Sequence, residues 1–458
     1  MSAILLIAVP LLAAFLSIMM KKLSSYVLLA VGIFNVVLLL ILPDGFVRIG
    51  EFNQPLGINL LLDTYSRIAL LLLNSLILVI TYLNLKSYKT YGTILLLALA
   101  GLNGLVLTND LFNFFVFLEI SGIAAYLITT SNKKPRSTFH YLMLGAVGSS
   151  LFLFGVIILY AMYGTLNMVG MIRLIQANGN YKEVILPFTL MFIGLGVEAK
   201  LLPFNSWVKG VLGNSNTLSG PMIASVYAGS MSFVLGRLIT NLFDFQGSLL
   251  TVVTIILAVG ILAGDLMAFA STKTREILLF SSVAQASIIA LLFVNGIIIW
   301  AVYLIIANAL SKTVMFLVIN KATKDIGSDE SQDLRGLFIK NILVGVTFTL
   351  ATLSVMGLPL LVGFKIKLAF LTGLADANHI WLIAIILIAS VIEGIYFVRL
   401  LVKLWYKGDK EINVSYNFSF KTVFVIIALA LLVFGTYSTP LSYLDNSIDT
   451  VMEEVNNG

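Results

Sequence analysis

Charged residues interrupt several of the most apolar stretches of this sequence. Segment 196–204, GVEAKLLPF, follows a run without charges and holds Glu198, Lys200 and Pro203 within six residues. A charge at the centre of a bilayer costs at least about 2.5–3.5 kcal/mol, and a proline removes a helical hydrogen bond. We therefore expect the charged residues and the proline of this apolar segment to have a function.

Further ionisable residues lie within apolar runs, namely Glu119, Lys312, Lys365, Lys367 and Glu393. An isolated lysine in a low-dielectric interior loses its proton readily, whereas a nearby carboxylate favours the charged form. A Glu–Lys pair in which the carboxylate can move away from the amine can therefore switch the lysine between its charged and neutral forms. We expect Glu119 and Lys200 to form this pair, and Lys312 and Lys367 to continue the path.

A static salt bridge, or a side chain that reaches the membrane interface, is the alternative for each charge. This alternative is strongest for Glu198, Lys365 and Glu393. Glu198 is two residues from Lys200, so on a regular helix the two side chains face different directions. The same spacing separates Lys365 from Lys367. Lys365 and Glu393 are kept as secondary candidates, and Glu198 has no assigned role.

Polar residues near these charges are further candidates for the path. Asn308 lies four residues before Lys312 on the same helical face, and Ser149 and Ser150 are its counterparts in the first half of the chain. Such groups can hold bridging water. His140 opens an apolar span and either admits protons or is merely hydrogen-bonded.

Composition defines the class of protein. The 458 residues are 59% hydrophobic and only 11% charged, whereas soluble proteins carry about 25% charge. Apolar runs of roughly 20 residues indicate an all-α polytopic membrane protein, without the alternating strands of a barrel. There is no cysteine to ligate an iron–sulfur cluster, only two histidines, and no phosphate-binding motif. We expect no catalytic centre, metal site or cofactor in this chain.

The apolar runs predict about fourteen membrane spans, near 3–20, 24–42, 64–85, 91–107, 111–129, 139–163, 185–204, 219–241, 248–269, 277–294, 297–320, 341–373, 380–405 and 420–438. The first run lacks a basic start and a cleavage site, so we expect a retained span and not a removed signal.

Basic residues predict the orientation. With the N-terminus outside, inner loops hold 18 of the 28 lysines and arginines, and outer segments hold four. Basic residues concentrate on the cytoplasmic side, so we expect a multi-pass protein of the cytoplasmic membrane with both termini outside. The net charge of +6 follows from this topology, and nucleic-acid binding is not expected.

An internal repeat appears at an offset near 160 residues. TNDLFNFF at 108–115 is matched by AGDLMAFA at 263–270, and GVEAKLLPF by MGLPLLVGFKIK at 356–367. Broken helices at corresponding places in inverted halves point to a midplane ion site, although Pro203 and Pro359 could be packing kinks. The predicted organisation is 1–90 (helices 1–3), 91–243 (first inverted five-helix repeat), 247–405 (second repeat) and 406–458 (last helix and acidic tail), with helices 7 and 12 broken.

Several motifs occur in an order that resembles a known family. NDLFNFFVFLEISGIAAYLI, GVEAKLLPFNSWVKG, STKTREILLFSSVAQASI and ANALSKTVMFL follow one another between residues 60 and 405. The order is similar to that of the antiporter-like proton-translocating subunits of respiratory complex I, Mrp sodium/proton antiporters and membrane-bound hydrogenase or sulfur-reductase complexes. The resemblance implies a fourteen-helix fold with a hydrated axis. It places the family's relay on Glu119, Lys200, Lys312 and Lys367.

The sequence also departs from this family. Gly229 stands where the family has a lysine in the eighth helix, and Asn308 stands where it commonly has a histidine. Glu198 replaces an aliphatic residue. These departures remove groups from the family's central relay, and they keep open the hypothesis of a structural subunit with reduced or lost conduction.

The leading functional hypothesis is an ion-translocating subunit of a multisubunit redox-driven complex. Its expected partners are other membrane subunits and peripheral redox subunits, which alone would hold iron–sulfur or metal centres. The transported ions would be protons, with sodium as a second candidate. A subunit of an Mrp-type antiporter and a free-standing transporter remain alternatives.

Overall fold

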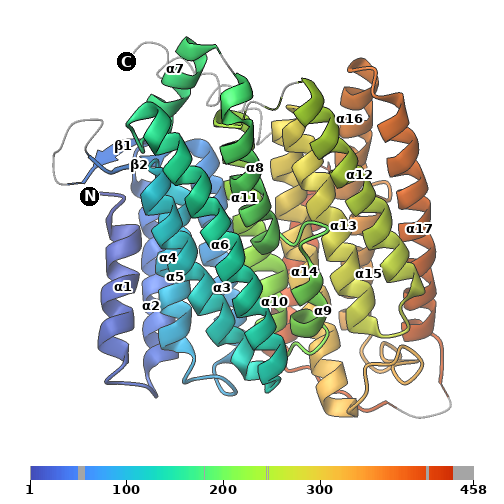
Figure 1. The fold of residues 1–458 in the computed structure, drawn as a ribbon. Coiled ribbons are helices and arrows are strands. Elements are labelled where there is room, and N and C mark those ends of the chain that lie inside the picture. The colour runs from blue at the N-terminus through green and yellow to red at the C-terminus, as the bar shows by residue number, and fades with distance from the viewer. Residues whose placement is uncertain are drawn as a thin grey trace.

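The computed structural model describes residues 2–49, 57–179, 181–243, 245, 247–408 and 412–436. The fold is almost entirely helical (Figure 1). Its α-helices are α1 (Leu5–Ser17), α2 (Ser24–Ile41), α3 (Thr64–Asn84), α4 (Gly92–Leu107), α5 (Leu111–Thr129), α6 (Pro135–Tyr163), α7 (Met168–Asn178), α8 (Tyr181–Glu198), α9 (Ser206–Leu212), α10 (Ser219–Pro221), α11 (Ala228–Asn241), α12 (Gly247–Ala270), α13 (Thr274–Val294), α14 (Ile298–Ile326), α15 (Ile342–Met356), α16 (Val362–Asp376), α17 (Ile380–Trp405) and α18 (Phe418–Thr436).

The helices follow the expected spans. Among the described residues, ten helical stretches are long and apolar enough to cross a membrane, including the continuous stretch from α10 to α11. The shorter apolar helices α1 and α4, and the interrupted pairs α8–α9 and α15–α16, bring the total to the fourteen expected spans. The all-α polytopic fold is confirmed. The orientation and the boundaries of the two repeats stay predictions, and the acidic tail lies outside the described residues.

The first broken helix, α8, ends at Glu198. The amide of Leu201 donates to Gly196 O (2.9 Å), and the amide of Lys200 donates to Val197 O (3.2 Å). These two bonds form a Schellman motif, which satisfies the last carbonyls of a helix. Lys200 therefore adopts φ 64°, a left-handed conformation that favours glycine.

The second broken helix ends in the same way. At the end of α15, the amide of Leu358 donates to Leu353 O (3.1 Å), and that of Gly357 donates to Ser354 O (3.2 Å). Gly357 has φ 80°, so Lys200 occupies in the first break the position that Gly357 holds in the second. Pro203 and Pro359 follow these helix ends by a few residues. The expected breaks are thus confirmed, although the Schellman turns end the helices before the prolines.

Two polar segments between the apolar runs contain regular structure. Strands β1 (Gly45–Arg48) and β2 (Asn59–Leu62) form an antiparallel hairpin in which Gly45 pairs with Leu62. Helix α7 begins after Asn167, whose side chain accepts from the amide of Gly170 (3.0 Å) and caps it. Figure 1 shows the hairpin and α7 at the same end of the bundle, opposite the α1–α2 connection.

Three spans form the centre of the bundle. In an apolar 18-residue window of each span, 94% of the residues are buried in the stretch from α10 to α11 and 89% in α13 and in α14, whereas only 33% are buried in α17. Helices that are apolar on all sides lie in the interior of a protein. Figure 1 shows α11, α13 and α14 between the early helices α1–α6 and the late helices α15–α17. Polar side chains on these central helices are therefore shielded from lipid.

Candidate functional site

Two predicted lysines meet on one turn of α13. The Lys200 ammonium donates to Ser282 Oγ (2.6 Å). The Lys312 ammonium, which comes from α14, donates to Ser281 Oγ (2.8 Å) and to Leu278 O (3.2 Å). Both lysines are almost completely buried, with 1% and 0% exposure. Adjacent serines thus hold the amines of the two halves of the chain.

The polar groups of α13 form a stripe along one face. Leu278 O, Ser281 Oγ and Ser282 Oγ accept hydrogen bonds from the two lysines. Gln285 Nε2 donates to Glu393 Oε1 (3.0 Å). Residues three, four and seven apart share a helical face. The sequence SSVAQ inside an apolar helix carries this signal, but Ser281, Ser282 and Gln285 were not among the predicted site residues.

A buried ion pair lies at the second broken helix. The Lys367 ammonium is 2.7 Å from Glu393 Oε2 and donates to Met356 O (2.8 Å), the last residue of α15. The side chains of Lys367 and Glu393 are 15% and 3% exposed. A cation at a helix C-terminus interacts favourably with the free carbonyls. Glu393, a secondary candidate in the sequence, is therefore the direct partner of Lys367.

The sequence prediction missed one acid of the second half, Asp265. Asp265, on α12, accepts from the Tyr396 hydroxyl (3.0 Å) and lies within electrostatic range of Lys312. The Lys312 nitrogen is also 5.7 Å from the ring centre of Phe397, within the range of a cation–π interaction. The only available signal was the position of Asp265 in an apolar helix, within the repeat motif AGDLMAFA.

Glu198 has its own partners. Its two carboxyl oxygens accept from the hydroxyls of Tyr126 (3.0 Å) and Tyr141 (2.9 Å). Glu198 is buried, and no ion pair joins it to Lys200. The expectation that the two side chains face different directions is consistent with these contacts.

Glu119 is half-buried on α5 and forms no ion pair with Lys200 in this structure. It lies within electrostatic range of Tyr126 and Glu198. In this structure the Lys200 ammonium donates to Ser282 instead. The predicted Glu119–Lys200 switch stays a prediction that requires a rearrangement.

The secondary candidates lie in different environments. His140 is exposed near the start of α6. Ser149 is buried and Ser150 is exposed, and both hydroxyls donate to Ala146 O of their own helix (3.2 and 2.7 Å). Lys365 donates to Thr436 O (3.2 Å) at the surface of the bundle. None of these contacts joins the secondary candidates to Lys200, Lys312 or Lys367.

Some buried polar atoms of the central helices lack a hydrogen-bond partner. Among the described residues, Asn308 Oδ1 and Ser311 Oγ on α14 are buried without a hydrogen-bond partner, as is the Tyr227 hydroxyl in the π-helix η2 (Met222–Tyr227). Buried polar groups without protein partners are typically satisfied by water. A Cβ added to Gly229 would meet nothing closer than Ile305 Cγ2 at 3.7 Å, so the position of the absent lysine has room for a methyl group.

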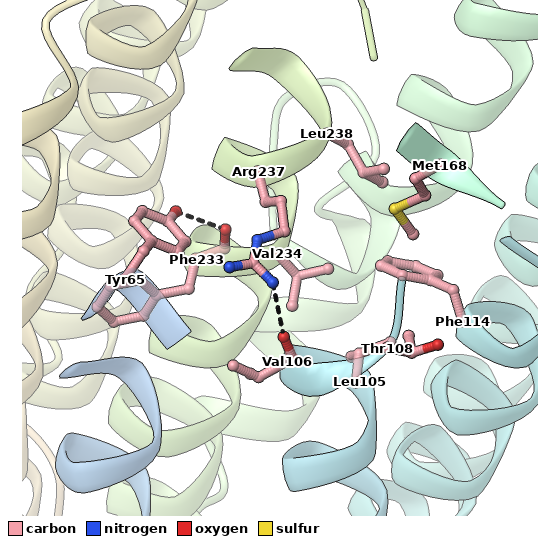
Figure 2. A pocket seen from close by; sticks show the side chains of 10 residues that line it. All are labelled: Tyr65, Leu105, Val106, Thr108, Phe114, Met168, Phe233, Val234, Arg237 and Leu238. Carbon is pink, nitrogen blue, oxygen red and sulfur yellow. Dashed lines mark hydrogen bonds between the residues drawn. The ribbon is translucent and has the colours of Figure 1, made fainter. Parts of the chain in front are cut away.

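A small pocket lies away from the lysines, at the end of α11. Figure 2 shows Arg237 in this pocket, donating to Val106 O (3.1 Å), and the Tyr65 hydroxyl donating to Phe233 O (2.6 Å). Arg237 also reaches both carboxyl oxygens of Asp63 (2.7 Å), the residue that caps α3. The pocket is therefore the place where α11 is anchored to α3.

Within the part of the chain that the structure describes, no three or more Asp, Glu or His residues are grouped so that they could hold a metal ion. The buried polar groups described above are amines, carboxyl groups and hydroxyls, which can exchange protons.

Residues 108–393, more than half of the chain, match the family described as "NADH:quinone oxidoreductase/Mrp antiporter, TM". The chain belongs to this family of antiporter-like membrane subunits. It is 28% identical over 435 residues to NADH-quinone oxidoreductase subunit N of Desulforudis audaxviator, which covers 88% of this chain and 86% of the relative. Subunit N of Dehalococcoides mccartyi is 28% identical over 391 residues, 79% of each chain.

Solved structures share the fold. A chain of the membrane-bound sulfane sulfur reductase, an archaeal respiratory membrane complex, superposes with a TM-score of 0.91 and 26% identity, covering 99% of this chain and 98% of the other. A chain of the Mrp complex of Dietzia sp. gives 0.85 at 20% identity, with 95% and 94% coverage. A chain of complex I from Thermus thermophilus gives 0.83 at 22%, with 96% and 98% coverage. The last two likenesses concern the fold alone.

Proposed function

We propose that this chain translocates protons across the cytoplasmic membrane as one subunit of a multisubunit redox-driven complex. The single observation that carries the proposal is the convergence of Lys200 and Lys312 on Ser282 and Ser281. An ammonium can only donate hydrogen bonds, whereas a hydroxyl both donates and accepts. Two amines on adjacent hydroxyls therefore provide donors and acceptors for a proton that crosses between the halves.

The path continues through the second half by Asp265, Glu393 and Lys367. Asp265 lies within electrostatic range of Lys312 and of the Glu393–Lys367 pair. Moving the charge of one group changes the energy of its neighbour, and such coupling is strong in a low-dielectric interior. A proton arriving at Lys312 would thus weaken or strengthen the ion pair at the second broken helix.

The energy source would lie in other subunits. The names of the relatives, NADH-quinone oxidoreductase subunit N and a sulfane sulfur reductase complex, describe redox assemblies. By analogy, iron–sulfur or metal centres would reside in partner subunits of this chain. The alternative is proton movement coupled to sodium exchange, since the fold is shared with a chain of an Mrp complex.

Co-purification with an ion-resolved transport assay tests this proposal. The tagged full-length chain is isolated in mild detergent, its partners are identified by mass spectrometry, and the complex is reconstituted into vesicles. We expect redox subunits with metal centres, and acidification driven by the electron donor without any need for sodium. Partners that are all small and apolar, with proton movement that depends on sodium, would instead establish an Mrp-type antiporter.

A further inference from the structure

We propose that Glu198 is an additional proton-binding group, which exchanges protons through Tyr126 and Tyr141 and controls the turn that carries Lys200. The inference rests on the proposed function and extends it to a residue that has no counterpart in the predicted relay. It is carried by the geometry around the end of α8.

The site is built from three helices around one buried carboxyl group. Tyr126 of α5 donates to Oε1 of Glu198 (3.0 Å), and Tyr141 of α6 donates to Oε2 (2.9 Å). Glu198 is 6% exposed. A buried carboxylate without a cation is costly unless hydrogen bonds stabilise it, and two hydroxyl donors are the only direct partners that it has among the described residues.

The lack of a side chain at Gly145 leaves space for these hydrogen bonds. A Cβ on Gly145 of α6 would lie 1.8 Å from the Tyr126 hydroxyl oxygen and 2.7 Å from Glu198 Oε1. Any side chain at this position would displace the hydrogen bond. Gly145 therefore allows the tyrosine hydroxyl and the carboxyl group to meet against the surface of α6.

Aromatic packing connects the cluster to both sides of the helix break. The Tyr141 ring stacks on Trp207 of α9 (3.9 Å between ring centres) and meets the Tyr126 ring edge-on (4.7 Å). The Trp207 indole donates to Val197 O (3.0 Å), and Val197 O also accepts from the amide of Lys200. A movement of Tyr141 would therefore reach the Schellman turn that positions Lys200.

The titratable groups that face Glu198 come from three elements. Tyr126 and the half-buried Glu119 belong to α5, Tyr141 to α6, and Tyr227 to η2. The Tyr227 hydroxyl is buried without a partner, so it is available to a rearranged network. The only one of these groups that adds charge is the acid Glu119, which disfavours a second negative charge nearby.

Protonation of Glu198 would reverse one of its hydrogen bonds. A carboxylate only accepts, so both tyrosines donate to it; a carboxylic acid has one O–H of its own and must donate it. One tyrosine would then accept from Glu198 and turn its own O–H toward another acceptor. Tyr126 lies within electrostatic range of Glu119, so protons could pass between the two acids through water and this hydroxyl.

A purely structural carboxyl group would behave differently from this exchange site. A structural Glu198 would keep one protonation state throughout the working pH range. Its replacement by glutamine, which retains an acceptor and the shape of the side chain, would then leave transport intact wherever the complex assembles. The two roles are therefore separable by spectroscopy and by transport.

The test compares Glu198→Gln, Tyr141→Phe and Gly145→Ala in the intact complex. Infrared difference spectra against pH record the C=O stretch of protonated carboxyl groups, and vesicles record proton transport. We expect Glu198→Gln to remove one pH-dependent band, and Tyr141→Phe to shift it. We expect transport to fall about tenfold in each variant, as for the loss of a hydrogen bond to a charged group.

Matched controls separate this inference from general damage. Tyr160→Phe removes an exposed hydroxyl from the same helix α6, and Gly170→Ala meets nothing closer than 3.6 Å; both should transport normally. If Glu198→Gln does not assemble, Tyr141→Phe and Gly145→Ala decide the question. An unchanged carboxyl band and full transport in the assembled variants overturn the inference. If Lys200→Gly also transports normally, the proposed function itself fails.

Discussion

The buried ammonium groups of Lys200 and Lys312 are held by neighbouring residues of α13. The two lysines are 112 positions apart in the sequence, one at a broken helix and the other within the long helix α14. Helix α13 is thus the element that joins the two halves of the predicted path. We predict that this junction, formed by the contacts of Lys200 and Lys312 with α13, limits the rate of proton transport.

Replacement of the two serines tests the junction. We expect Ser282→Ala to lower proton transport about tenfold, because a hydrogen bond to a charged group is worth about 1.5–3 kcal/mol and about 1.4 kcal/mol corresponds to tenfold. Ser281→Ala should have a smaller effect, since Lys312 retains Leu278 O. Ser287→Ala on the same helix is the control, because the Ser287 hydroxyl donates to Val283 O of α13 itself. Equal rates for all three variants would contradict the account.

The ion pair of Lys367 and Glu393 is expected to be strongly coupled. Removing one partner of a buried pair costs about 3–5 kcal/mol, because the other charge stays buried and uncompensated. We expect Lys367→Met and Glu393→Gln each to destabilise the protein, and the double variant to lose less than the sum of the two. Thermal unfolding in detergent provides the double-mutant cycle. Strictly additive losses would show that the contact carries no interaction energy.

Two glycines of α11 should respond in opposite ways to alanine. A Cβ at Gly229 would meet only ordinary contacts, at 3.7 Å or more. Gly229→Ala should therefore be neutral or stabilise the helix by up to about 1 kcal/mol. At Gly236 a Cβ would lie 2.3 Å from Phe293 Cζ, and such overpacking costs about 1–3 kcal/mol. Thermal unfolding measures both, and equal effects would be evidence against this packing.

Stability should depend on pH through Asp329, in the loop after α14. Burial raises the pKa of Asp329 to about 6, despite the opposing charge of Arg275. The folded state therefore favours the neutral acid. Its contribution to stability is complete below the unfolded pKa of about 3.9 and is lost as pH rises through about 6.

The Asp329→Asn variant isolates this contribution. Its side chain keeps an acceptor for the amide of Arg275, which donates to Asp329 Oδ1 (3.2 Å). We expect wild type to lose about 1–2 kcal/mol relative to the variant between pH 4 and 7, after allowance for solvent screening. Melting curves at several pH values measure the difference. A constant difference over this range would disagree with the raised pKa.

The helices and the buried lysines could be predicted from sequence, because apolar length and intramembrane charge are strong local signals. Charge within an apolar run singles out Lys200 and Lys312, and the family resemblance points to the same two residues. Their shared contact with α13 depends on how distant helices pack, which the sequence does not state directly. The serines lay in a visible polar stripe, and its helical spacing was a usable signal.

Other features had weaker signals. Helix α7 and the β1–β2 hairpin are short and lie in segments of mixed polarity, so apolar length did not reveal them. Glu198 could not be explained by its neighbours in sequence, since its partners Tyr126 and Tyr141 come from two other helices. The pairing of these tyrosines with a buried acid appears only in three dimensions.

The most direct test of the central claim is the number of protons moved per electron in the reconstituted complex with Lys200→Gly. Lys200 has φ 64°, and a side chain in this conformation costs roughly 1–2 kcal/mol, so glycine removes the amine without adding strain to the turn. Lys200→Arg keeps the charge but cannot release a proton. The account predicts assembled complexes in which both variants lower the proton-to-electron ratio. An unchanged ratio in Lys200→Gly would contradict it.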